Sequence, residues 1–225
     1  IMTDSIFFGA VISVVGYLIG IFLRKKISVL NPLLVSIIFV IAVIKIFHID
    51  YETYNSGAKY ISYLLTPATV CLAIPLYRQI SVLKEHAKEV FIGILAGVLA
   101  SMGSILLMSY FFGLTHEQYV TLLPKSITTA IGMGVSEELG GIQTITVAVI
   151  IITGVLGNII AEAVLKIFRI KEPVAKGLAI GTASHAIGTT KALEIGEIEG
   201  AMSSLSVAVA GLMTVISASI FANMM

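Results

Sequence analysis

The chain has 225 residues, of which 57% are hydrophobic and only 12% are charged, and its mean hydropathy is +1.03. Soluble domains carry about 25% charged residues, so this composition excludes an ordinary soluble domain and predicts an integral membrane protein. The formal net charge is +1 without a long basic run, which argues against nucleic acid as a partner. The single cysteine, Cys71, excludes an internal disulfide.

Six apolar stretches are each close to the length of about 20 residues that a helix needs to cross a bilayer. Basic residues follow the first, third and fifth stretches, beginning at Arg24, Arg78 and Lys166. Because positively charged loops stay in the cytoplasm, we expect an all-α, multi-pass protein of the cell inner (cytoplasmic) membrane, with its N-terminus outside. The predicted spans are 6–23, 28–47, 60–77, 90–112, 141–165 and 201–223.

The third predicted span contains Pro67 near its start and Pro75 near its end. Proline removes a backbone donor and clashes with the preceding turn, so we expect this span to be kinked or broken. The sequence predicts one compact membrane domain with two halves. Residues 1–113 form the half with the kinked span, and residues 114–225 form the other half.

Two segments rich in glycine, serine and threonine are left between the spans, at 124–141 and 177–194. With six spans, the first approaches the membrane from outside and the second from the cytoplasm. Each precedes an apolar helix, so the C-terminal half resembles two similar units of opposite orientation. Inverted repeats with broken or re-entrant helices are common in transporters. The sequence leaves open whether these segments re-enter the membrane or cross it completely.

Both segments combine hydroxyl groups with a cation, the groups that would bind a small carboxylate. Helix N-termini attract anions, and ionisable groups inside a membrane are functional hypotheses by default. The alternative is structural: Lys125 extends to water while hydroxyls cap a helix, and 177–194 is a cytoplasmic loop with an amphipathic helix. The candidate substrate-binding residues are Lys125, Ser126, Thr128, Thr129, Thr182, Ser184, His185, Thr189, Thr190 and Lys191.

Proton coupling is a further hypothesis, because histidine titrates near neutral pH. Its candidate residues are His185, Glu138 and Glu162. No enzyme is expected, since Ser184 and His185 are helix neighbours whose side chains point apart and no third residue orients them. No cofactor and no metal site are expected either.

Three blocks of the sequence resemble the LrgB/CidB family, and together they extend the resemblance over essentially the whole chain. They are 65–77 (LTPATVCLAIPLY), 123–133 (LPKSITTAIGM) with 138–141 (ELGG), and 177–189 (GLAIGTASHAIGT) with 199–201 (EGA). The resemblance implies an antiholin-like protein that controls murein hydrolase activity and cell lysis with a small holin-like partner of the LrgA/CidA type. The family's plant relative is a chloroplast glycolate/glycerate translocator, and bacterial pairs are connected with pyruvate uptake.

Two functions are therefore expected. The first is transport of small monocarboxylates, of the pyruvate, glycolate, glycerate or lactate class, by alternating access. The alternative is an antiholin-like regulator of murein hydrolase export or activity that acts through its holin-like partner. The sequence does not determine the oligomeric state, and a homo-oligomer stays open.

Overall fold

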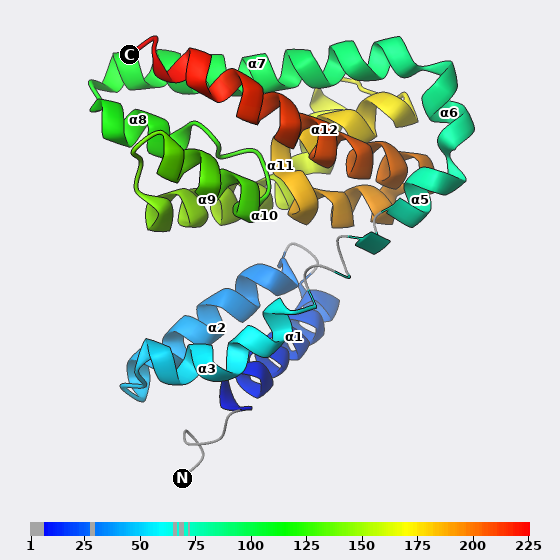
Figure 1. Cartoon of the computed structure of the whole chain (residues 1–225). Coiled ribbons are helices and arrows are strands. Elements are labelled where there is room, and N and C mark those ends of the chain that lie inside the picture. The colour runs from blue at the N-terminus through cyan, green and yellow to red at the C-terminus, as the bar shows by residue number, and fades with distance from the viewer. Residues whose placement is uncertain (1–6, 28–29, 65–66, 68–69, 72) are drawn as a thin grey trace. The chain divides into compact units, whose positions relative to one another are not determined.

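The computed structural model describes residues 7–27, 30–64, 67, 70–71 and 73–225. Within these ranges the regular structure is entirely helical, which confirms the predicted all-α class. The chain divides into two compact units, Ile1–Cys71 and Leu72–Met225 (Figure 1). The sequence instead placed its boundary after residue 113. The structure joins α7 (Ala87–Phe112) to the larger unit, because this helix packs on α11 (Pro173–Ile195) and α12 (Glu197–Ala222).

The smaller unit contains α1 (Phe8–Lys26), α2 (Pro32–Ile46) and α3 (Tyr51–Ser62). Asn31 caps α2, because its Oδ1 accepts hydrogen bonds from the backbone N–H groups of the first turn, and a proline follows it. Asp50 caps α3 in the same way. The predicted span 60–77 is not one helix: α3 ends at Ser62 and turn residues follow, before Pro67 is reached. Parts of the first family block, at 65–66, 68–69 and 72, lie outside the described residues.

The larger unit begins with two short helices, α5 (Ala73–Arg78) and α6 (Ile80–Glu85), before the long α7. It continues with α8 (His116–Leu122), α9 (Thr129–Glu138), α10 (Gln143–Ile167), α11 and α12. Among the described residues, α1, α7, α10 and α12 are long and apolar enough to cross a membrane, and α2 is a shorter apolar helix. Large apolar side chains on α7 are exposed, such as Leu107 and Phe111, which suits a surface that faces lipid.

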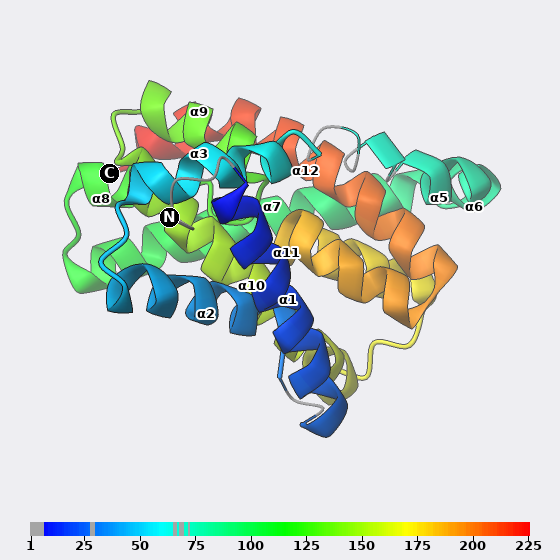
Figure 2. The same ribbon diagram turned by 90° about the horizontal axis from the view of Figure 1, so that it is seen from below.

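Residues 173–195 form a hairpin and not a straight helix. The backbone leaves the helical conformation at His185, where φ is 42° and ψ is −144°. A Cβ on Gly188 would lie 3.2 Å from the Ile180 carbonyl oxygen, although eight residues of a straight helix span about 12 Å. The two arms, 173–184 and 186–195, therefore fold back on each other, as the yellow-to-orange ribbon shows in Figures 1 and 2. We call this segment the second hairpin and residues 184–186 its tip.

Helices α8 and α9 form a comparable hairpin, which we call the first hairpin, with residues 123–128 as its tip. The Thr146 hydroxyl of α10 lies 2.8 Å from the Thr121 carbonyl oxygen on α8 and 2.7 Å from Ser136 Oγ on α9. A Cβ on Gly132 would lie 3.5 Å from the Pro124 carbonyl oxygen, again eight residues away. With ten residues, α9 spans only about 15 Å, half of a hydrocarbon core of about 30 Å. Both segments therefore turn back on themselves and do not form one straight helix.

The two hairpins enter the helical body from opposite ends. The first arm of α11 runs parallel to α7, because Gly93 faces Leu178 and Gly97 faces Thr182. It runs antiparallel to α10, because Gly154 of α10 faces His185 whereas Leu165, eleven residues further on, lies in one cluster with Ile180. Helices α7 and α10 are consequently antiparallel, and each is followed by a hairpin that returns toward its middle.

Candidate functional site

The first hairpin carries Lys125 to the middle of α7. The Lys125 ammonium donates to Ser101 Oγ at 3.2 Å and to Ser126 Oγ at 3.1 Å, and these two hydroxyl oxygens are 2.8 Å apart. Ser101 lies fourteen residues after Ala87, or about 21 Å along the helix. In a helix of 26 residues, this position is close to the middle.

Apolar packing holds the tip in this place. Leu123 and Ile127, on either side of Lys125, are each 1% exposed, and they belong to the main core cluster. In α8, the buried Tyr119 donates its hydroxyl to the Phe221 carbonyl oxygen of α12 at 2.9 Å. The apolar residues that flank Lys125 and Ser126 are thus buried in the core and fix the position of the ammonium.

A cavity of about 750 Å³ lies between α7, the first tip and the first arm of α11. Small residues line its middle. Gly97 faces Thr182 there, and a Cβ at residue 97 would lie only 2.6 Å from Thr182 Cγ2. Polar residues stand at both ends. The lining residues are His86, Glu89, Gly93, Gly97, Ala100, Ser101, Ser104, Lys125, Ser126, Glu172, Val174, Ala175, Leu178, Ala179, Thr182 and Ala183.

The two ends of this cavity differ in charge. Glu89 and Glu172 stand where α7 and α11 begin, whereas Lys125 stands about 18 Å further along α7. Among the described residues, no carboxylate oxygen lies within 4 Å of the Lys125 ammonium. The end of the cavity at Lys125, which we call its inner end, therefore has an ammonium without a neighbouring counter-charge. This arrangement favours an anionic ligand.

Thr182 supplies a second polar group at the inner end. Its side chain is 6% exposed, and its hydroxyl has no hydrogen-bond partner within the described structure. It lies between the large cavity and a void of about 10 Å³ that Ser101, Ser126 and Thr214 also line. That void is close to the size of one water molecule. An unpaired buried hydroxyl is costly, so a ligand or water that accepts a hydrogen bond from it would stabilise the site.

Of the ten predicted substrate-binding residues, Lys125, Ser126 and Thr182 line this cavity. The other residues of the first segment, Thr128 and Thr129, begin α9 and are not among the lining residues. Thr128 occupies the N-cap position, although its side chain makes no capping hydrogen bond.

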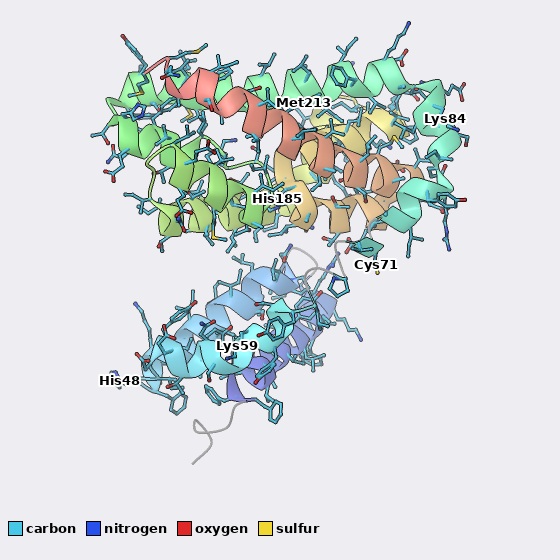
Figure 3. All side chains as sticks on the ribbon, viewed as in Figure 1. His48, Lys59, Cys71, Lys84, His185 and Met213 are labelled. Carbon is cyan, nitrogen blue, oxygen red and sulfur yellow. The ribbon has the colours of Figure 1, made fainter. Side chains whose placement is uncertain are left out.

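The second tip packs against α10, away from this cavity. His185 Nε2 lies 2.9 Å from the Ile150 carbonyl oxygen, and the side chain is 3% exposed. Gly154 and Gly157 leave room for His185 and Ser184, whose atoms would collide with a Cβ at either glycine. In Figure 3, His185 lies inside the larger unit. The structure therefore does not bring His185 and Lys125 into one cavity.

The remaining predicted residues also have partners within the protein. The Thr189 hydroxyl bonds to Ser203 Oγ at 2.8 Å, and that of Thr190 donates to the Ile187 carbonyl oxygen. The Lys191 ammonium lies 2.6 Å from Glu162 and 3.2 Å from Glu194. Of the three residues predicted for proton coupling, Glu162 is therefore in an ion pair and His185 is buried against α10. The third, Glu138, is exposed at the end of α9.

The site residues predicted from the sequence do not include Ser101, Glu89 or Glu172. The available signal was the spacing of small residues on α7, where Gly93, Gly97 and Ser101 follow one another at intervals of four. That spacing predicts close packing of helices, which Leu178 and Thr182 do provide. The same face also lines the cavity.

The LrgB-like family model matches residues 13–224 of the chain. The chain is 38% identical over 217 residues to the antiholin-like protein LrgB of Bacillus mycoides (strain KBAB4). The proteins of that name from Bacillus cereus (strain B4264) and Bacillus anthracis (strain CDC 684) match equally well. Each alignment covers 95% of this chain and 94% of the relative. No solved structure shows significant similarity to the chain.

Proposed function

The chain belongs to the LrgB-like family of antiholin-like membrane proteins, and from this premise and the Lys125 cavity we propose that it transports small monocarboxylates. The observation that carries the proposal is the Lys125 ammonium near the centre of the helical body, hydrogen-bonded to two hydroxyls. A charge at the bilayer centre costs about 2.5–3.5 kcal/mol even on the lowest scales. A carboxylate at Lys125 would offset that cost.

The cavity suits a small acid that binds at its inner end. One carboxylate oxygen would accept from the Lys125 ammonium, and the Thr182 hydroxyl would donate to a second oxygen of the same molecule. The volume of about 750 Å³ lies within the usual range of ligand sites and leaves room for water beside an acid of a few atoms. Pyruvate, lactate, glycolate and glycerate all have this size and charge.

Alternating access would follow from the arrangement of the hairpins. The cavity extends from Lys125 toward the start of α7, the end that the basic residues Lys84 and Lys88 assign to the cytoplasm. Hairpins that enter from opposite ends and meet helices near their middles resemble the broken elements of secondary transporters. Movement of the first hairpin relative to α7 would open Lys125 to the other side.

Uptake by reconstituted full-length protein tests this proposal. Proteoliposomes are supplied with labelled pyruvate, lactate, glycolate or glycerate, and Lys125→Gln is compared with the wild type and with Lys88→Gln. Loss of a charge-assisted hydrogen bond costs about 1.5–3 kcal/mol, so we expect Lys125→Gln to weaken the apparent affinity by about tenfold to a hundredfold. Lys88→Gln removes an equal charge outside the cavity and is expected to retain wild-type affinity. Wild-type uptake equal to that of empty liposomes for all four acids would refute the proposal.

The second candidate function is regulation of cell lysis through a small holin-like membrane partner. The observation that favours it is the name of the relatives, which are called antiholin-like proteins at 38% identity. A lysis assay in cells that express the partner separates the two functions. If Lys125→Gln abolishes transport but leaves lysis control and partner binding unchanged, regulation is independent of the cavity. If it abolishes both, regulation depends on the bound acid.

A further inference from the structure

We propose that a second cavity, at the end of α10, binds the headgroup of an anionic phospholipid. This cavity has a volume of about 520 Å³ and shares no lining residue with the Lys125 cavity. Four cations line it: Lys166, Arg169, Lys171 and Lys176. The proposal does not depend on transport, because it concerns different residues.

Two of these four cations have a carboxylate partner among the described residues, and two do not. Lys176 pairs with the buried Glu199 at 3.6 Å. Among the described lining residues Glu162 is the one acid, and it lies 2.6 Å from Lys191 and 3.9 Å from Lys166. For Arg169 and Lys171, no carboxylate of the described residues lies within 4 Å. Their charges remain available to a phosphate ester.

The end of α10 explains why cations and apolar side chains meet here. Arg169 adopts the left-handed conformation with φ of 55°. The Ile170 N–H bonds to the Leu165 carbonyl at 2.9 Å, and the Arg169 N–H bonds to the Lys166 carbonyl at 3.2 Å. This pair of bonds is a Schellman motif, which brings the side chain after the left-handed residue onto the last turn. Ile170 is thereby turned inward to pack with the Leu165 cluster.

The apolar floor distinguishes a lipid from a free phosphate. Leu165, Ile170 and Ile195 line the cavity beneath the cations. Beside it, Ile167 and Phe168 are 74% and 72% exposed. A soluble phosphate gains nothing from these groups, whereas a phospholipid places acyl chains against them and its phosphate among the cations. Because α10 is long and apolar enough to cross a membrane and ends at Ile167, its end lies at headgroup level, where basic pockets recruit anionic lipids.

Native mass spectrometry of the full-length protein in neutral detergent tests the proposal. Binding of phosphatidylglycerol and phosphatidylcholine is titrated for the wild type, for Arg169→Gln/Lys171→Gln and for Lys84→Gln/Lys88→Gln. The control removes two exposed cations near the start of α7, at the same end of the helical body, and Lys84 points outward there (Figure 3). Each cation near an anionic surface contributes a factor of about five, so we expect the first double variant to bind phosphatidylglycerol about thirtyfold more weakly. The control is expected to change binding less than twofold.

Glycerol 1-phosphate and inorganic phosphate are added as soluble competitors, and circular dichroism checks that each variant is folded. Equal loss in both double variants would mean a general charge effect and would overturn the proposal. Displacement of lipid by either competitor at similar concentration would assign the cavity to a soluble anion instead, and equal binding of both lipids would remove the role of the cations. Selective loss in the first variant, resistant to both competitors, supports the site.

Discussion

Replacing Gly97 with alanine is expected to disturb the contact between α7 and α11, and replacing Thr182 with serine is expected to restore it. A Cβ at residue 97 would lie 2.6 Å from Thr182 Cγ2, but 3.4 Å and 3.9 Å from its Cβ and Oγ1. The collision therefore involves a single methyl group. Serine lacks that methyl group and keeps the hydroxyl that faces the cavity.

Two opposing effects set the size of this change. Overpacking costs about 1–3 kcal/mol, whereas alanine is favoured over glycine inside a helix by about 1 kcal/mol. Gly97→Ala should thus lie between neutral and about 2 kcal/mol less stable. The double variant should recover the full overpacking cost, which gives a coupling energy of about 1–3 kcal/mol. Gly103 on the same helix has no atom within 4 Å of the position that a Cβ would occupy, so Gly103→Ala should be neutral or slightly stabilising.

Thermal unfolding of the full-length protein in detergent, followed by circular dichroism, measures these differences. The chain contains no tryptophan, so intrinsic tryptophan fluorescence offers no signal. The wild type, both single variants, the double variant and Gly103→Ala are compared. If the double variant unfolds at the same temperature as Gly97→Ala, or if Gly103→Ala is equally destabilised, the proposed contact between α7 and α11 is incorrect.

Three further substitutions can be measured in the same way. A Cβ at Gly181 would collide with the backbone carbonyl of Ser203, so Gly181→Ala should cost about 1–3 kcal/mol; a variant as stable as wild type would contradict this close approach. His185 has a backbone conformation that glycine tolerates best, and relief of about 1–3 kcal/mol of strain should leave His185→Gly more stable than His185→Ala, an order whose reversal would refute the break at this residue. Glu199→Gln removes the partner of Lys176 and should cost about 1–3 kcal/mol, whereas an unchanged unfolding temperature would show that the pair adds no stability.

The long helices of the larger unit could be predicted from hydropathy because each is an uninterrupted apolar run. The spans 90–112, 141–165 and 201–223 correspond to α7, α10 and α12 with ends that differ by a few residues. The span 60–77, which was expected to be kinked or broken, is not one helix, because its start belongs to a polar helix that Asp50 initiates and that ends at Ser62. Whether 177–194 crosses or returns could not be predicted. A single backbone conformation at His185 decides it, and no pattern of residue types in the segment encodes that conformation.

The candidate site was only partly accessible from the sequence. The pattern around Lys125 indicated an intramembrane cation with hydroxyl groups, and the structure places Ser126 beside it. The partner Ser101 lies 24 residues earlier on an apolar helix, and only the return of the first hairpin brings the two together. From its sequence surroundings, His185 was an equally good candidate for binding a ligand. In the structure its tip packs on Gly154 and Gly157 of α10, about thirty residues earlier in the chain. Sequence alone does not reveal which helix a hairpin tip contacts.

The bond from Tyr119 to Phe221 has a consequence for how the protein is assembled in the membrane. It joins residues 102 positions apart, so the tip that carries Lys125 acquires its support only after α12 has been synthesised. Until then the described partners of the ammonium are limited to Ser101 of α7 and the neighbouring Ser126, and entry into lipid without the later helices is unfavourable. We expect the first hairpin to stay at the membrane surface during translation and to insert last. Protease accessibility of this hairpin in nascent chains arrested before and after Phe221 would test this order.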